Sequence, residues 1–400
     1  MKKDREYYWG GFFAGALSAL ICVMLFMGIT MVTGFLDWPG LFFGRSSSVM
    51  TREVNQKLRE VQAYIDKYYL EDIDKEKMEE SLCQGMVAGL GDRYAAYYNI
   101  ENYADMREKT MGNYCGIGAY VSQDATTGAI TIVEPIEGSP AWKAGLVAGD
   151  IINEVDGKSV EGMDLSSVVS KMKGKEGTKV KVSVWRNGEK KARKFTITRE
   201  EILTPTVEHK MLEGNVGLIA VSAFEDVTKK QFRDALDELE AEGQKALIID
   251  LRNNGGGLIT TAVDMLDRLL PKGLLVYTQD KESNKEEYNA TDDESLDKPI
   301  AILVNEHSAS ASEVFAGAMQ DYEKAVLVGT TTFGKGIVQS VFDLTDGTAL
   351  KLTTSKYYTP KGRNIHGIGL EPDIRVELEE QKDNEIDNQV KRAIEYLKKQ

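Results

Sequence analysis

Residues 301–339 read AILVNEHSASASEVFAGAMQDYEKAVLVGTTTFGKGIVQ, and this stretch decides the fold. Ala301–Val304 is an apolar run that predicts a buried strand, and a helix is expected from about Glu313 to Met319. A second apolar run at 325–329 predicts the next strand. The same order of strand, loop and helix occurs earlier, within residues 246–270. This repetition predicts an α/β core, in which functional sites form beyond the ends of the strands.

Three serines, Ser308, Ser310 and Ser312, lie where the first of these strands turns into the helix. A helix start presents free N–H groups and the positive end of the helix dipole, so it suits a nucleophile whose reaction creates an oxyanion. Serines in this position are more usually N-caps, and Ser308 and Ser312 are most simply interpreted in that way. The residues alone do not select one of the three as a nucleophile.

Lys335 is the candidate base, because the sequence has only three histidines and this lysine lies in an apolar context. A lysine accepts a proton only when it is neutral. Lowering its pKa from about 10.4 to about 7–8 requires burial and corresponds to roughly 4 kcal/mol. Gly334 and Gly336 allow close packing around the amine. Gln339, four residues after the lysine, would share a strand face with it and is expected to orient the amine.

The segment Gly329–Gly336 also comes close to the phosphate-binding pattern G-x-x-x-x-G-K-[ST]. Two observations oppose a nucleotide site. Gly336 stands where the pattern needs a magnesium-binding hydroxyl, and the β-branched run that follows predicts a strand where the pattern needs a helix. A nucleotide-dependent enzyme is therefore a minor alternative.

Three features together resemble the carboxyl-terminal processing peptidases, also called tail-specific proteases. They are S-A-S-A-S-E at 308–313, F-G-K-G at 333–336 and a glutamine four positions after the lysine. The resemblance covers the chain from about residue 50 to the end. It implies a Ser–Lys dyad assisted by the glutamine, with Ser310 as nucleophile, Lys335 as base and Gln339 as the residue that holds the base.

A glycine turn, Gly255–Gly257, follows the apolar run that ends near Leu251. Three glycines allow a backbone N–H to approach a substrate closely. In the resembling family, one amide of this turn and the amide just after the nucleophile form the oxyanion hole, which implies Gly256 and Ala311 here. A plain strand-to-helix turn is compatible with the same residues.

Residues 105–200 resemble a PDZ domain, through Gly116-Ile117-Gly118, A-G-L at 144–146 and G-D-I-I at 149–152. The glycine-spaced loop would expose backbone N–H groups that hold a terminal carboxylate. The strand beside it would add a peptide strand, and Val168 and Val169 of a later helix would line the side-chain pocket. The expected ligand is the apolar C-terminal tail of a protein substrate.

The N-terminal region predicts a membrane anchor. Residues 1–6 carry three basic side chains, and residues 7–36 contain no charged side chain, which exceeds the roughly 20 residues needed to cross a bilayer. Positive residues before the span predict a cytoplasmic N-terminus and a body outside the cytoplasm. A cleaved signal peptide is the competing interpretation, opposed by the length of the apolar run and the lack of a clear cleavage site.

Residues 37–50 are predicted to be a linker, and residues 51–104 a helical segment. Apolar residues at helical spacing form two stripes there. The first comprises Val54, Leu58, Val61 and Ile65, and the second comprises Met78, Leu82, Met86 and Leu90. A helical pair of this kind would either pack on the body or form a homodimer.

The net charge of −14 argues against a nucleic-acid binder and against a surface that lies on anionic lipid. The three cysteines form neither a disulfide framework nor a metal-ligand pattern, and the neighbours of His366 give no metal spacing. No metal and no other cofactor is expected.

The sequence therefore predicts an α/β protease core at residues 201–400 with an inserted PDZ domain, a mixed α+β arrangement that follows a helical segment and a single transmembrane helix. The expected function is that of a serine endopeptidase, anchored in the cell membrane, that recognises C-terminal tails and cleaves extracytoplasmic proteins. The alternative is a non-catalytic, membrane-anchored PDZ adaptor with a protease-like fold. The complete set of serine, lysine and glutamine argues against that alternative.

Overall fold

The structure is a computed structural model that describes residues 49–291, 295–379 and 386–400. Contacts between Cα atoms divide the chain into two compact units, residues 1–75 and 76–400. The predicted transmembrane span at residues 7–36 lies outside the described residues. Within the described residues, no helix is long and apolar enough to cross a membrane.

The two apolar stripes near the N-terminus form helices, as the spacing predicts. In the first unit, helix α2 (Arg52–Tyr68) begins at Thr51, whose hydroxyl accepts a hydrogen bond from the Val54 amide at 3.3 Å. In the second unit, helix α3 (Lys75–Ala88) carries the other stripe. Among the described residues neither helix contains a buried residue, and five residues of the two stripes are exposed: Leu58, Val61, Leu82, Met86 and Leu90.

The region predicted as a PDZ domain, residues 105–200, forms a small sheet with its own core, to which strands β4, β5 and β7 contribute many of the buried side chains. Helix α6 (Leu165–Met172) packs on this core, and α5 (Pro140–Ala144) follows the serine cap Ser139. A short pair, β2 (Asn113–Gly116) with β9 (Glu200–Leu203), stands at the two ends of the region. The strand order is β3 (Ala119–Gln123), β4 (Ile130–Pro135), β5 (Ile151–Val155), β7 (Lys179–Trp185) and β8 (Arg193–Thr198), and β6 (Lys158–Ser159) pairs with β5.

The region predicted as the protease core, residues 201–400, is built on a second sheet whose central strands are parallel, which confirms the predicted α/β character. Successive residues of its strands point to opposite faces, so Leu247 and Ile249 belong to one apolar cluster and Ile248 to another. The strand order is β10 (Val207–Leu212), β11 (Val216–Val221), β12 (Ala246–Asp250), β15 (Ile300–Val304), β16 (Ala325–Gly329) and β19 (Ile374–Arg375), with β10 antiparallel to β11.

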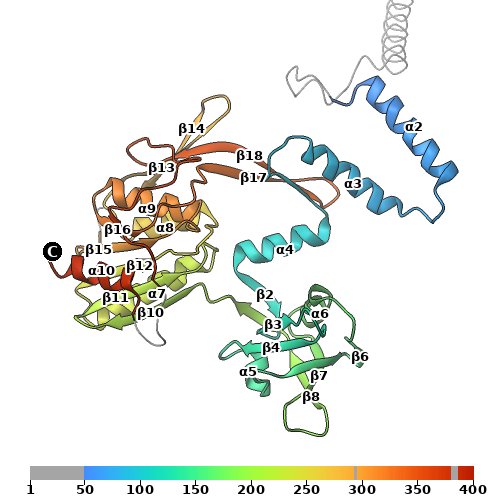
Figure 1. Cartoon of the computed structure of the whole chain (residues 1–400), viewed down its shortest axis with the longest axis horizontal. Helices are drawn as coiled ribbons and strands as arrows, with labels where there is room; N and C mark the ends of the chain where they lie inside the picture. The colour runs from blue at the N-terminus through green and yellow to red at the C-terminus, as the bar shows by residue number, and fades with distance from the viewer. Residues whose placement is uncertain (1–48, 292–294, 380–385) are drawn as a thin grey trace, which may run out of the picture. The chain divides into compact units, whose positions relative to one another are not determined.

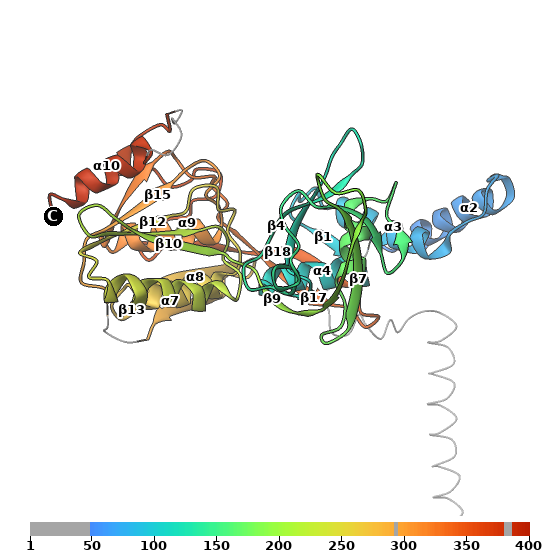
Figure 2. The same ribbon diagram turned by 90° about the horizontal axis from the view of Figure 1, so that it is seen from below.

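Helices cover both faces of this sheet (Figures 1 and 2). In Figure 2, α10 lies on one side of the strands and α7 and α8 lie on the other. The bounds of these helices are α7 (Thr228–Ala241), α8 (Ile259–Asp267), α9 (Ala311–Asp321) and α10 (Asn388–Leu397). The C-terminal helix α10 packs on the core through Val390, Ala393 and Leu397.

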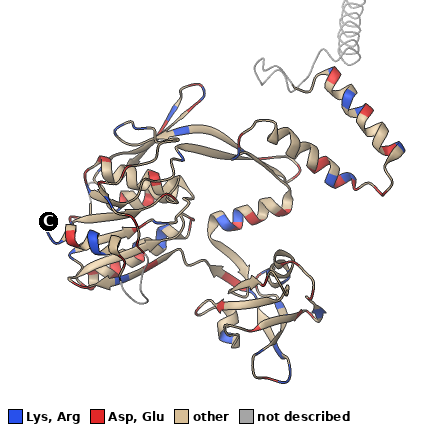
Figure 3. Cartoon of the chain, viewed as in Figure 1, with Lys and Arg blue, Asp and Glu red and all other residues tan. Residues whose placement is uncertain are grey.

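A third sheet carries an antiparallel hairpin that turns around Asp346-Gly347. Its strands are β1 (Ala96–Tyr98), β18 (Ala349–Tyr358), β13 (Gly273–Asp280), β14 (Lys285–Ala290) and β17 (Ile337–Asp343). Helix α4 (Ile100–Met111) follows β1 directly along the chain. The charged side chains of these elements are mixed in sign over the described residues, as Figure 3 shows.

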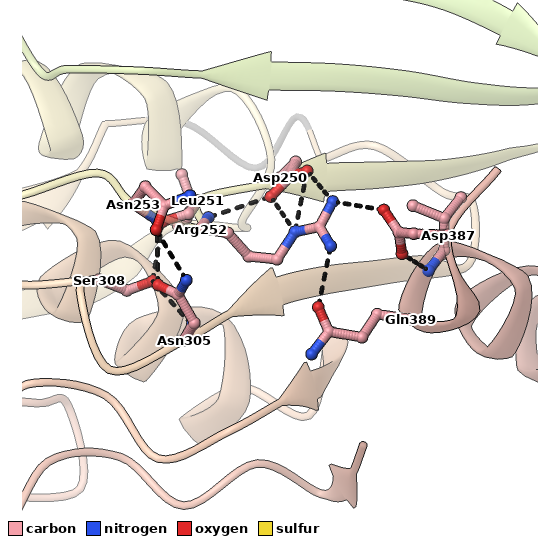
Figure 4. A network of polar contacts seen from close by, with 9 residues as sticks. Asp250, Leu251, Arg252, Asn253, Asn305, Ser308, Asp387 and Gln389 are labelled. Atoms are coloured by element: carbon pink, nitrogen blue, oxygen red, sulfur yellow. Dashed lines mark hydrogen bonds and ion pairs between the residues drawn. The ribbon is translucent and has the colours of Figure 1, made fainter. Parts of the chain in front are cut away.

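An ion-pair network fastens the C-terminal helix to the end of strand β12 (Figure 4). The guanidinium of Arg252 donates to both oxygens of Asp250, with Nε–Oδ1 at 2.9 Å and Nη2–Oδ2 at 2.6 Å. It also donates to Asp387 Oδ2 at 2.9 Å and to Gln389 Oε1 at 2.8 Å. Asp387 in turn caps α10 by accepting from the Val390 amide at 2.8 Å. One arginine therefore connects the sheet to α10.

Replacing Arg252 with Met should lower the free energy of unfolding by about 3 kcal/mol, because Asp250 and Asp387 would be left without their cation in a largely buried site. The measurement is urea unfolding of the full chain followed by circular dichroism. The matched control is Arg233→Met, whose ion pair with Asp264 is exposed and should contribute less than about 1 kcal/mol. Equal effects of the two substitutions would contradict this account.

Candidate active site

Two of the three serines in the turn before α9 are structural. Ser308 and Ser312 have no exposed surface, and their hydroxyls donate to the carbonyls of Leu251 and Asn254, each at 2.8 Å. They hold the turn against the loop that follows β12. Their interpretation as N-caps was therefore wrong, because the N-cap of α9 is Ser310. The helix accordingly begins at Ala311, two residues before the expected start.

Ser310 differs from its neighbours in both exposure and backbone conformation. It is half-buried, and its backbone has φ +57° and ψ −113°, outside the regions that L residues favour. Such a conformation costs of order 1–3 kcal/mol and persists only where the surroundings impose it. Strained residues of this kind concentrate at functional sites. The structure thus distinguishes Ser310 from the other two serines, which the sequence alone could not do.

All five residues predicted for catalysis line a single cleft of about 620 Å³. Ser310, Lys335 and Gln339 contribute side chains to it, and Gly256 and Ala311 lie beside the serine. The other walls come from α4, from the segment after β11 and from strands β17 and β18. The cleft is open enough to admit a polypeptide side chain and is lined by both apolar and charged groups.

Gly256 lies closer to Ser310 than a residue with a side chain could. A Cβ atom added to it would lie 2.6 Å from the Ala309 carbonyl, 2.8 Å from Ser310 Cβ and 2.9 Å from the Ala311 amide nitrogen. Its φ of +99° also favours glycine. Two predicted oxyanion-hole residues are therefore adjacent in space.

The two amides of the predicted oxyanion hole differ in whether they already donate a hydrogen bond. Among the hydrogen bonds of the described residues, none uses the Ala311 N–H, which is the first of α9. The Gly256 N–H instead donates to Asn254 Oδ1 at 2.9 Å. An oxyanion would have to compete with that side chain for the second donor.

Lys335 lies in the loop before β17 and not within a strand. Burial lowers its pKa, and the neighbouring positive charges of Lys351 and Arg93 lower it further, while Glu313 and Asp92 act in the opposite direction. Its ammonium lies 4.7 Å from the ring centroid of Tyr94. No hydrogen bond of the described residues joins its Nζ to Ser310 Oγ.

Gln339 lines the same cleft as Lys335, but not through the strand face that the sequence predicted. The prediction that Lys335 and Gln339 share a strand face was wrong. Lys335 precedes the strand, and the register of β17 shifts between Val338 and Gln339. The Gln339 side-chain amide lies 3.5 Å from the Thr353 hydroxyl on the paired strand β18. Both residues nevertheless line the cleft.

Two residues that sequence reasoning missed hold this site together. Asn254 is fully buried, and its side-chain amide donates to the Val221 carbonyl at 2.8 Å. Glu313 is also fully buried, and its carboxylate accepts from the Ser310 amide at 2.9 Å. A signal for Glu313 was present, since Ser310-x-x-Glu313 is the capping-box pattern. The sequence contains no comparable signal for Asn254.

The phosphate-loop alternative finds no support in the backbone. Lys335 is followed by strand β17 and not by a helix. The amides of Gly334 and Lys335, which that motif would offer to a phosphate, donate to the carboxylate of Glu313 at 2.7 and 2.8 Å.

No group of three or more His, Cys, Asp or Glu side chains in the described ranges is arranged to hold a metal ion.

In the PDZ region, the residues predicted to bind peptide differ in how available they are to a ligand. The amides of Ile117 and Gly118 donate no hydrogen bond among the described residues, while the Ile117 carbonyl accepts from the Ala141 amide at 2.7 Å. Strand β3 is an edge strand of its sheet. The Ile117 and Val168 side chains are buried in the domain core, and Val169 is only partly buried. Gly116 is paired with Glu200 in the β2–β9 ladder.

Comparison with known proteins agrees with this architecture. Residues 215–376 match the peptidase family S41, and residues 131–186 match the PDZ domain. The chain is 38% identical over 364 residues to a "probable CtpA-like serine protease" of Staphylococcus saprophyticus, a match that covers 90% of this chain and 72% of the relative. This chain belongs to peptidase family S41. It is a serine peptidase of the carboxyl-terminal processing type.

A further relative and a solved structure are also similar to this chain. The protein of the same description from Staphylococcus aureus strain N315 is 36% identical over 362 residues, covering 89% of this chain and 72% of the relative. Among solved structures, a photosystem II D1 C-terminal processing protease is 32% identical, with a TM-score of 0.47 and coverage of 80% of this chain and 86% of that chain.

Replacing Gly256 with Ala should abolish most proteolytic activity and destabilise the chain by more than about 1 kcal/mol, because the new methyl group would overlap backbone atoms of residues 309–311. The measurements are hydrolysis of unfolded casein and urea unfolding. Gly255→Ala is the matched control for stability, since a Cβ there meets nothing within 4 Å. A Gly256→Ala chain as stable and active as the wild type would contradict the close approach.

Proposed function

We propose that this S41 peptidase cleaves polypeptides with a Ser–Lys dyad formed by Ser310 and Lys335. The observation that carries the proposal is the selection of Ser310 by its environment. It is the one serine of its turn that is strained, partly exposed and positioned on the cleft, while Ser308 and Ser312 are buried in structural bonds. Lys335 lines the same cleft, and burial lowers its pKa toward the range of a general base.

In the proposed reaction, Ser310 Oγ forms a bond to the scissile carbonyl carbon while neutral Lys335 accepts the hydroxyl proton. The amides of Gly256 and Ala311 stabilise the resulting oxyanion. When the C–N bond breaks, Lys335 returns the proton to the leaving amine and an acyl-enzyme ester remains. Water then hydrolyses the ester, with Lys335 again as the base and Gln339 holding the amine in place.

Two rearrangements would bring the described site to this reactive geometry. The amine of Lys335 must leave the ring of Tyr94 and reach Ser310 Oγ. The Gly256 amide must exchange its bond with Asn254 for the substrate oxyanion. Ser310, Lys335 and Gly256 line one cleft, and substrate binding would supply the energy for both rearrangements.

Ser310→Ala in the full chain should lower the turnover of casein by at least about 10⁴-fold while leaving the unfolding curve unchanged. The matched control is Ser312→Ala, two residues along the same turn. It should reduce stability by about 1–2 kcal/mol, because it removes the hydroxyl that holds the Asn254 carbonyl, yet retain turnover of the same order as the wild type.

Cleavage that survives Ser310→Ala would remove this assignment. Binding of tail peptides by the wild-type chain without any turnover would instead be the result expected of a non-catalytic adaptor. Activity that requires ATP and magnesium would indicate the nucleotide-dependent alternative.

The PDZ domain is proposed to bind the apolar C-terminal tail of a protein substrate. The unused amides of Ile117 and Gly118 suit a terminal carboxylate, and the free edge of β3 suits an added peptide strand. The side chain of Gln123, at the end of β3, bonds to the Met163 carbonyl and the Leu165 amide at the start of α6. This fixes α6 beside the edge where a peptide would lie.

Val169→Lys should weaken the binding of a peptide with an apolar C-terminal residue by about 10-fold, because Val169 is the partly exposed apolar residue of α6. Fluorescence anisotropy of a labelled peptide provides the measurement, and the same peptide with an amidated end should bind weakly to the wild type. By contrast, Val168→Ala should lower stability by about 1–3 kcal/mol, since that side chain is fully buried. Wild-type affinity in Val169→Lys would place the peptide elsewhere.

The anchoring of the chain also remains a proposal. Residues 7–36 would hold it in the cell membrane with the catalytic part outside the cytoplasm. The exposed apolar faces of α2 and α3 are the proposed contacts of a homodimer, since neither contains a buried residue within one chain.

A further inference from the structure

The carboxylate of Glu313 is the most heavily bonded acidic group near the catalytic cleft. The side chain lies in the first turn of α9 and has no exposed surface. Its Oε1 accepts from the Thr332 hydroxyl at 2.5 Å and from the Gly334 amide at 2.7 Å. Its Oε2 accepts from the Ser310 amide at 2.9 Å and from the Lys335 amide at 2.8 Å. Four donors therefore converge on one buried side chain.

A capping box alone would explain only one of these four bonds. In that motif, the residue at the third helical position reaches back to the amide of the N-cap, which here is Ser310. The other three bonds go to residues 332–335, which lie about twenty positions later in the chain. The glutamate therefore joins two separate segments in addition to capping its own helix.

The two segments joined by Glu313 carry the two members of the dyad. A single atom, Oε2, accepts from the amides of both Ser310 and Lys335, so the spacing between these two backbones is fixed by one oxygen. The bond to the Ser310 amide also opposes relaxation of its strained backbone. The loop is held a second time where the Thr332 hydroxyl accepts from the Leu370 amide at 2.7 Å.

We propose that Glu313 is a positioning residue of the peptidase, which sets the distance and orientation between the nucleophile Ser310 and the base Lys335. This inference rests on the dyad proposed above. Glu313 faces no substrate and takes no proton in the reaction, because it acts through the backbone of the two reacting residues.

Glu313 also acts on the base through its charge. Its carboxylate raises the pKa of Lys335, as does Asp92, against the lowering by burial, Lys351 and Arg93. The amine also lies over the ring of Tyr94, and the buried phenol of Tyr357 donates to the Ser310 carbonyl at 3.2 Å. The charged residues Arg107, Lys109 and Glu225 line the same cleft. Since neutral lysine is the active form, removing the carboxylate charge lowers the pKa of Lys335 and moves the acid limb of the rate profile to lower pH.

The test compares Glu313→Gln and Glu313→Asp in the full chain, with kcat, KM and the pH dependence of kcat/KM measured on a quenched fluorescent peptide. Both variants should reduce kcat by about 10–100-fold with little change in KM, because the dyad is displaced while the cleft remains. The acid limb should move to lower pH in Glu313→Gln, which loses the charge, and stay in place in Glu313→Asp, which keeps it.

Two controls calibrate the result. Lys351→Gln removes a positive charge near the base, so its acid limb should move to higher pH, opposite to Glu313→Gln. Glu371→Gln removes an exposed carboxylate that, among the described residues, accepts a hydrogen bond from the Thr331 hydroxyl of the Lys335 loop, and it should leave both kcat and the acid limb unchanged. A Glu313→Gln enzyme with wild-type kcat and an unmoved limb would overturn the inference.

Two further results distinguish a failure of the positioning role from a failure of the proposed dyad or of variant folding. If Ser310→Ala is inactive while Glu313→Gln is normal, the dyad stands and the positioning role alone fails. If both Glu313 variants fail to fold, the inference is tested on the wild-type chain by hydrogen exchange, measured by mass spectrometry of its peptides. The amides of Ser310 and Lys335 should be protected and should open together, and fast exchange of either one would exclude the shared carboxylate.

Discussion

The active site depends on the way one buried asparagine joins three segments of the chain. Asn254 donates its side-chain amide to the Val221 carbonyl at the end of β11 and accepts from the Gly256 amide within its own turn. Its backbone carbonyl accepts from the Ala309 amide at 3.0 Å and from the Ser312 hydroxyl at 2.8 Å. Every one of these groups is shielded from water, so each bond that is lost would leave a buried polar group unsatisfied.

This connection explains why the backbone of Ser310 can be strained. The turn that carries Ser310 is fixed on one side by Ser308 and Ser312 and on the other by Glu313. The surrounding bonds therefore supply the few kcal/mol that an unfavourable backbone conformation costs. The close approach of Gly256 follows from the same connection, because a side chain at that position would separate the two turns.

Much of this arrangement followed from sequence patterns that reflect local physics. Apolar runs such as Ala301–Val304, and the repeated order of strand, loop and helix, predicted the α/β core. The spacing of apolar residues predicted α2 and α3. The family resemblance supplied the dyad residues, which the structure brings to one cleft.

What the sequence could not supply were the contacts between segments far apart in the chain. The roles of Ser308 and Ser312 depend on carbonyls more than fifty residues away, so local rules assigned them to helix capping. The strand-face argument for Gln339 failed because a change of register in β17 is invisible in a pattern of alternating residues. Nothing in the stretch around Asn254 indicates that its side chain turns inward to bond β11.

The hydrogen bond between the Gly256 amide and Asn254 has a consequence for inhibition. On the proposed assignment, a boronic acid or aldehyde that mimics the tetrahedral adduct would find one of its two donors already engaged. Its binding would then be limited by rearrangement of the glycine turn and not by diffusion, giving slow-onset kinetics. Compounds that instead break the hydrogen bond between the Gly256 amide and the Asn254 side chain would act on the resting enzyme without resembling any substrate.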